Sequence, residues 1–140
     1  MAVRFADTNI LLYAVSRDPR EQRKAAVASE ILTSRDLALS AQVLQEFYVQ
    51  ATRASRPDAL THAQAAGLVE SFTRFPVAAT TVAIVVAATE TRQRFQLSYW
   101  DAAILEGARS LGCETVLSED LSDGQDYVGV SVENPFREVQ

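Results

Sequence analysis

The side chains most able to do chemistry in this sequence are four carboxylates spread along the chain: Asp7, Glu46, Asp101 and Asp120. Asp101 opens a predicted helix, and the positions three and four residues on hold Ile104 and Leu105 instead of a cation that could pair with it. Glu46 lies mid-helix beside an apolar stripe, where a carboxylate is costly unless a charge from elsewhere compensates it. The sequence therefore predicts that something cationic faces these acids.

Two of the four acids also have an ordinary structural explanation. Asp7 can cap the helix that follows it by accepting hydrogen bonds from the first backbone amides. Ser98 and Asp101 have the spacing of a capping box, in which each side chain satisfies a backbone N–H of the other residue. Glu46 has no such explanation, because capping is unavailable in the middle of a helix.

Carboxylates that converge in a fold need a counter-charge. Like charges raise one another's pKa and repel, which is destabilising. A hard divalent cation removes that problem, and Mg²⁺ and Mn²⁺ both prefer oxygen ligands to histidine or cysteine. Such an ion activates water and neutralises charge on a phosphate, so it suits phosphodiester hydrolysis. A set of acids without histidine therefore points towards a metal-dependent nuclease.

Short apolar strands alternate with helices along the chain. The predicted strands are residues 3–6, 37–40, 76–79, 115–118 and 130–132, and the predicted helices are about 9–15, 20–33, 41–54, 61–75, 81–95 and 99–112. This order implies a parallel sheet covered by helices on both faces. Ligands bind such sheets beyond the carboxyl ends of the strands, where we expect Asp7, Glu119 and Asp120.

The bulk properties describe an ordinary globular chain. We expect residues 1–140 to form a single domain, and the 48% hydrophobic and 22% charged residues argue against disorder. The longest apolar stretch, residues 76–89, is shorter than the about 18 residues of a membrane span, so we expect a core strand and helix there. No signal peptide is recognisable, and we predict a cytoplasmic protein without a membrane segment.

Nucleic-acid contacts depend on where the cations lie. The net charge of −5 predicts weak nonspecific binding unless basic residues gather locally. Four do so in one segment: Arg17, Arg20, Arg23 and Lys24. Beside the acids they could bind RNA phosphates, although a solvated helix face explains them equally well. Trp100 and Tyr99 could stack on an unpaired base, but core packing is the favoured interpretation beside a buried helix start.

Several short motifs resemble those of the PIN-domain ribonucleases, especially the VapC toxins of bacterial toxin-antitoxin pairs. They are Asp7-Thr8-Asn9, Gln45-Glu46-Phe47, Ser98-Tyr99-Trp100-Asp101-Ala102, Ser118-Glu119-Asp120-Leu121, Asp123-Gly124-Gln125 and Asn134-Pro135-Phe136. The likeness covers the whole chain. It implies a PIN-like three-layer α/β/α fold with a central parallel sheet, Mg²⁺-dependent cleavage of RNA, and inhibition by a cognate antitoxin.

The resemblance also implies roles for individual residues. Carried across by position, Asp7, Glu46 and Asp101 hold the metal ion. Asp120 is the fourth acid, for a second metal or a water, with Glu119 and Asp123 as alternatives. Supporting hydrogen bonds to a carboxylate or a water come from three neighbouring polar side chains: Thr8, Asn9 and Ser118.

Partners and alternatives complete the prediction. Leu11, Leu12 and Tyr13, with the alanine-rich helices, exceed what one small core needs, so we expect a homodimer face or an antitoxin groove. The alternative function is a non-catalytic regulatory binding module that keeps the PIN fold. A phosphatase with an aspartyl nucleophile has little support, because the first strand is followed by Asp-Thr-Asn and not by Asp-x-Asp.

Overall fold

Five short parallel strands form the central sheet of the computed structural model, which describes residues 4–139. The strands are β1 (Arg4–Ala6), β2 (Leu37–Ser40), β3 (Val77–Ala78), β4 (Thr115–Leu117) and β5 (Ser131–Glu133). Their order across the sheet is β3-β2-β1-β4-β5, and every neighbouring pair is parallel. Each predicted strand is confirmed to within one residue at either end, except that Val3 lies outside the described residues.

Six α-helices lie between the strands in this part of the chain. They are α1 (Thr8–Ala14), α2 (Gln22–Ile31), α3 (Ala41–Ala51), α4 (His62–Phe72), α5 (Val82–Phe95) and α6 (Tyr99–Ser110), and a short 3-10 helix, η1 (Pro19–Glu21), precedes α2. Ser40, Thr61 and Ser98 each cap the following helix by accepting a backbone N–H from its first turn. No helix within residues 4–139 is long and apolar enough to cross a membrane.

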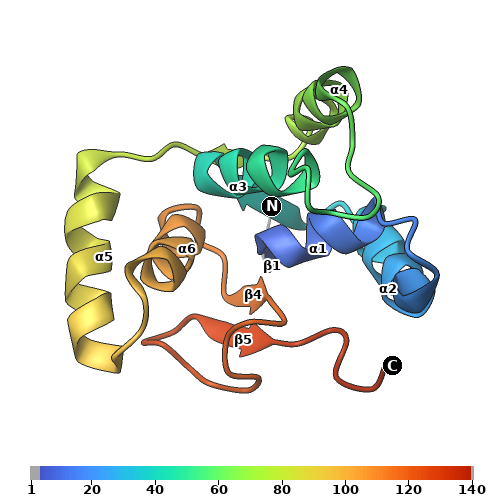
Figure 1. Cartoon of the computed structure of the whole chain (residues 1–140). Helices are drawn as coiled ribbons and strands as arrows, with labels where there is room; N and C mark the ends of the chain where they lie inside the picture. Colours follow the sequence, from blue (N-terminus) through green and yellow to red (C-terminus); the bar gives the residue numbers. More distant parts are fainter. Residues whose placement is uncertain (1–3, 140) are drawn as a thin grey trace.

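The helices cover the sheet on both sides (Figure 1). In this view α5 and α6 lie to the left of the strands, and α1 and α2 lie to the right. Phe5 and Ala6 of β1 and all four residues of β2 are buried, as expected for parallel strands covered on both faces. The predicted three-layer α/β/α architecture with a central parallel sheet is therefore confirmed.

Two expectations about apolar surface are wrong. The helix α5 packs against α6 at the edge of the molecule, and Ala88 is the single buried residue of α5. Val82 and Val86 point outward, with 80% of Val82 exposed, so the stretch 76–89 is not core throughout. Leu11 and Leu12, predicted as spare apolar surface, are instead part of the core. The exposed valines of α5 lie on one of the alanine-rich helices that the sequence also predicts to have apolar surface to spare.

The order of the strands reverses at β1. β2 and β3 are added on one side of β1, and β4 and β5 are added on the other. In doubly wound sheets, ligands bind beyond the carboxyl ends of the strands at this reversal. Asp7 directly follows β1 and Ser118 directly follows β4, and the Asp7 backbone N–H donates to the Leu117 carbonyl at 2.9 Å. The topology thus brings two predicted site residues together.

Candidate active site

A cleft with a volume of about 190 Å³ opens at this reversal of strand order. It is lined by Asp7, Thr8, Asn9, Leu12, Glu46, Gln50, Trp100, Asp101, Ile104 and Asp120. The four predicted acids reach it from four places: the end of β1, the middle of α3, the first turn of α6, and the loop after β4. Segments far apart in the sequence therefore place all four carboxylates in one cleft.

Asp7 is buried and serves two purposes. Its Oδ1 accepts the Thr8 backbone N–H at 2.7 Å, which caps α1, and its Oδ2 accepts the Ser118 hydroxyl at 2.7 Å. Burial raises the pKa of Asp7 to about 7, against the lowering effect of these two hydrogen bonds, and the charges of Asp120 and Glu46 raise it further. The capping interpretation is thus correct for Oδ1. Burial and the neighbouring acids nevertheless disfavour the charged form of the carboxylate.

Glu46 is held by neutral donors. Its Oε1 accepts the Thr8 hydroxyl at 2.7 Å, and its Oε2 accepts the Gln42 side-chain amide at 3.1 Å. The cation that the sequence predicts for this residue is absent from the ion pairs among residues 4–139. Gln42 was missed as a functional residue, although its spacing of four residues before Glu46 on the same helix was a usable signal.

Asp101 shows only one half of the predicted capping box. Its backbone N–H donates to the Ser98 hydroxyl at 3.1 Å, which caps α6. Burial raises the pKa of the Asp101 carboxyl, the nearby Ser98 hydroxyl lowers it, and the charges of Asp120 and Glu46 raise it. The carboxylate therefore faces other acids, and the cap is supplied by Ser98.

The fourth acid in the cleft is Asp120. Its Oδ2 accepts the Asn9 side-chain amide at 3.1 Å. Glu119 is turned away, because it forms an ion pair with Lys24 and accepts the Tyr13 hydroxyl at 2.6 Å. Asp123, the other alternative, is paired as well, because its Oδ2 lies 3.1 Å from Nη1 of Arg137. Of the three acids that the sequence left open, only Asp120 lines the cleft.

The three predicted supporting side chains each donate a hydrogen bond to a different acid: Thr8 to Glu46, Asn9 to Asp120 and Ser118 to Asp7. Thr8 and Asn9 belong to the first turn of α1, so one short helix orients two carboxylates. Ser118 is fully buried, and its Oγ also accepts the Asp120 backbone N–H at 3.1 Å. These contacts fix the positions of the acids without adding charge.

If the chain cleaves RNA with a metal ion held by these acids, as the sequence predicts, replacing Ser118 by Ala should slow that cleavage by about 10- to 100-fold, the usual cost of losing a group that orients a metal ligand. The variant removes the donor to Asp7 and the acceptor for the Asp120 backbone N–H. Initial rates at saturating and at low Mg²⁺ measure the loss. Ser110→Ala is the matched control, because that hydroxyl donates only to the Gly107 carbonyl within α6. Equal rates for the two variants would assign Ser118 no part in orienting the acids.

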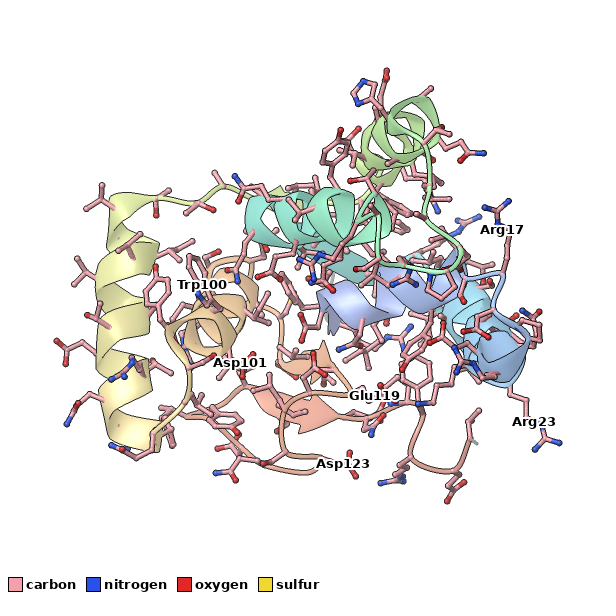
Figure 2. The ribbon with its side chains drawn as sticks, viewed as in Figure 1. Arg17, Arg23, Trp100, Asp101, Glu119 and Asp123 are labelled. Carbon is pink, nitrogen blue, oxygen red and sulfur yellow. The ribbon has the colours of Figure 1, made fainter. Side chains whose placement is uncertain are left out.

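The four basic residues predicted to bind RNA do not line the cleft. Figure 2 shows Arg17 and Arg23 projecting from the opposite side of the molecule to Asp101. Arg20 pairs with Asp18 at 2.8 Å, and Lys24 pairs with Glu119. Lys24 is therefore held one residue from the cleft acid Asp120, and the role of the four basic residues in RNA binding stays a prediction.

The two aromatic residues at the start of α6 differ in their surroundings. Tyr99 is half-buried against Ala88, Ala102 and Ala103, as core packing predicts. Trp100 is 63% exposed and lines the cleft beside the acids. Core packing, the favoured interpretation from the sequence, is therefore wrong for Trp100.

The donor set fits a hard divalent cation in its chemistry. All four acids offer oxygen ligands, and within residues 4–139 no ion pair joins any of them to lysine or arginine. As these side chains stand, no three acidic, histidine or cysteine residues in this range form a group that could hold an ion. Burial, and then the charges of Asp120 and Glu46, raise the pKa values of Asp7 and Asp101, so a bound cation would stabilise both carboxylates in their charged form.

Solved structures with the same fold come from bacterial toxins. A VapC toxin from Mycobacterium tuberculosis, described as cleaving the sarcin-ricin loop, superposes with a TM-score of 0.64 at 22% identity over 84% of this chain and 91% of that chain. A toxin-antitoxin complex from Klebsiella pneumoniae superposes with a TM-score of 0.64 at 22% identity, over 96% of this chain and 98% of that chain. DNA-bound VapBC from Salmonella typhimurium superposes with a TM-score of 0.66 at 18% identity, over 96% of this chain and 99% of that chain.

At these identities the likenesses show the fold. Among curated protein sequences, none matches the chain. The sequence pattern of the PIN domain matches residues 4–122. That range runs from β1 to the loop after β4 and contains the four acids of the cleft. A match over this much of the chain, together with the shared fold, means that the chain belongs to the PIN domain family.

Proposed function

We propose that this chain is a Mg²⁺-dependent endoribonuclease, able to use Mn²⁺ as well, that hydrolyses phosphodiester bonds of RNA. The observation that carries the proposal is that four carboxylates meet at the reversal of strand order, and that none of them forms an ion pair with lysine or arginine among residues 4–139. Such a site is costly unless a cation joins it, and members of the PIN domain family are typically nucleases. The cation that resolves this cost is also the one that phosphodiester hydrolysis needs.

Asp7, Glu46 and Asp101 would hold the ion, which when bound supplies activation of water and neutralisation of charge on the phosphate. The chain's own residues fix the geometry before the substrate arrives. Thr8 orients Glu46, and Ser118 orients Asp7 from a fully buried position. Asp120, held by Asn9, is the acid we assign to the attacking water or to a second ion.

We further propose that the chain acts as a toxin in the cytoplasm, neutralised by a cognate antitoxin and paired with a second copy of itself. Two of the structures with the same fold are toxin-antitoxin complexes by name. Two apolar surfaces are open for partners. One is the groove between α3 and α4, lined by Leu44, Gln45, Tyr48, Val49, Ala66 and Val69. The other is the exposed face of α5 with Val82 and Val86.

The test is cleavage of a mixed RNA pool by the purified, metal-stripped protein. Cleavage should appear when Mg²⁺ or Mn²⁺ is added and stop when a chelator is added, because the acids hold the ion weakly enough to exchange. Sequencing the new RNA ends identifies the target. RNA binding without cleavage at any metal concentration would instead support the non-catalytic regulatory module.

A further inference from the structure

Trp100 is exposed in a way that the other aromatic residues are not. All of the phenylalanine and tyrosine side chains are buried or half-buried, whereas 63% of Trp100 is open to solvent. Tryptophan carries a large apolar surface, and its burial in a core would contribute to stability. Folding does not use that surface here. The position of Trp100 therefore suggests a ligand that covers it.

The backbone beneath the indole is tied to the acidic cleft. The Gln42 side-chain amide donates to the Trp100 carbonyl at 3.0 Å and to Glu46 at 3.1 Å, so one side chain links the aromatic residue to an acid. The rings of Tyr99 and Trp100 meet edge to face, with centroids 5.0 Å apart and an angle of 84° between their planes. These contacts restrain the indole while its surface stays open, which reduces the entropy cost of binding.

Trp100 also forms the wall between two hollows. One is the acidic cleft, which Trp100 lines together with Asp101. The other lies on the side of α3 and α5, and its lining includes Ser40, Gln45 and Ile84. Trp100 is the only residue shared by the two linings. An RNA strand with one phosphate over the acids would therefore place a neighbouring nucleotide next to Trp100.

We propose that Trp100 is the stacking platform for the base of an unpaired nucleotide next to the scissile phosphate. The inference deepens the proposed function and rests on it. The acids of the cleft repel a polyanion, and the four clustered basic residues do not line it. Stacking attracts a base without depending on charge, and every base offers a flat face. A base inside a duplex has both faces covered, so the substrate class is single-stranded or looped RNA.

A contact with a protein partner is the competing explanation for an exposed tryptophan. The broad apolar surfaces suited to such a partner lie on α5 and between α3 and α4. One side of Trp100 lines the smaller hollow with Ile84 of α5, but the other side adjoins Asp101 in a cleft whose lining is largely polar. The surroundings of Trp100 therefore favour RNA, and the experiments below separate the two possibilities.

The chain has one tryptophan, so its fluorescence reports on this position alone. The probe is a short unpaired RNA oligonucleotide, mixed with the protein in Mg²⁺ by stopped flow so that binding is read before cleavage. The single strand should quench the fluorescence, and the same strand annealed to its complement should not. An unquenched signal with the single strand, or equal quenching by the duplex, would overturn the proposal whether or not the protein cleaves RNA.

Kinetics of two variants provide the second test. Trp100→Ala should lower kcat/KM on single-stranded RNA by roughly 5- to 150-fold, the range that follows from alanine substitution of a base-stacking residue. The loss should fall mainly on KM, and Trp100→Phe should restore most of it because a flat ring remains. Val128→Ala is the matched control, since it shortens an exposed apolar side chain in the loop before β5, away from the cleft and from both proposed partner surfaces.

The outcomes are distinguishable from failure of the nuclease itself. If the wild-type protein cleaves RNA and Trp100→Ala cleaves it with unchanged kcat and KM, the stacking platform is wrong while the nuclease stands. If Trp100→Ala instead loses only its binding to a protein partner, the competing explanation is correct. If the wild-type protein cleaves no RNA in any metal, the proposed function fails, and the quenching experiment still decides whether Trp100 binds unpaired bases.

Discussion

Replacing Asp101 by Asn removes cleavage of RNA and leaves the free energy of unfolding nearly unchanged. The expected loss of rate exceeds the about 10- to 100-fold that removal of an orienting group costs, because this carboxylate is a proposed ligand of the ion itself. The fold should survive, because the Asp101 backbone N–H keeps its hydrogen bond to the Ser98 hydroxyl. Asparagine also has the same shape as aspartate and relieves repulsion from Asp120 and Glu46.

Initial rates in Mg²⁺ and urea unfolding in a chelator measure the two halves of this prediction. Asp123→Asn is the matched control, because that acid also follows β4 but pairs with Arg137 outside the cleft. It should keep its activity. Full activity in Asp101→Asn would end the assignment of this residue to the metal site. Loss of the folded state would mean that the carboxylate is structural, as the capping box implies.

The metal-free Asp7→Asn variant is more stable than the wild-type protein at neutral and higher pH. Burial raises the pKa of Asp7 from its ordinary 3.8 to about 7. Between these values the folded protein keeps a proton that the unfolded chain has released, so wild-type stability falls as the pH rises through this window. At pH values above 7 the wild-type protein has lost roughly 4 kcal/mol of its free energy of unfolding, at about 1.4 kcal/mol for each unit by which the pKa is raised. Asparagine does not ionise, so the Asp7→Asn variant does not lose this stability as the pH rises.

Urea unfolding in a chelator, from about pH 5.5 to about pH 8, follows the difference between variant and wild type. That difference should grow with pH and then level off. Adding Mg²⁺ should stabilise the wild type more than the variant, because an ion bound only by the folded state stabilises it. Asp36→Asn is the control: the hydrogen bond from Arg4 lowers the pKa of that carboxyl below its ordinary 3.8, so the loss of stability in this variant should not change with pH in this window. A wild-type stability that is independent of pH in this window would contradict the burial of a charged Asp7.

The convergence of Asp7 and Asp120 could be predicted from the sequence because it depends on topology alone. Both follow apolar strands, and the carboxyl ends of parallel strands meet at one edge of a sheet. The position of Glu46 could be predicted less directly, from the cost of an unpaired acid beside a buried stripe. No lysine or arginine pairs with Glu46 among residues 4–139, and hydrogen bonds from Thr8 and Gln42 hold its carboxylate in place.

What the sequence could not predict depends on contacts between distant segments. The choice of Asp120 over Glu119 rests on Lys24, which lies 95 positions from Glu119 and becomes its partner only in the folded chain. The exposure of Trp100 was missed for a related reason. Helical periodicity gives the direction of a side chain around its own helix, but it does not reveal whether another element covers it. For Trp100 no element does, since most of its surface remains exposed.

The hydrogen bond from the Ser118 backbone N–H to the Glu133 carbonyl joins the loop of Asp120 to β5. β4 pairs with β1 on one side and with β5 on the other, so β5 supports the strand and the loop that place Ser118 and Asp120. A ribosome that has translated Asp7, Glu46 and Asp101 but not residue 133 carries a nascent chain that lacks a finished site. A nascent chain therefore completes the site proposed here late, after β5 has been translated.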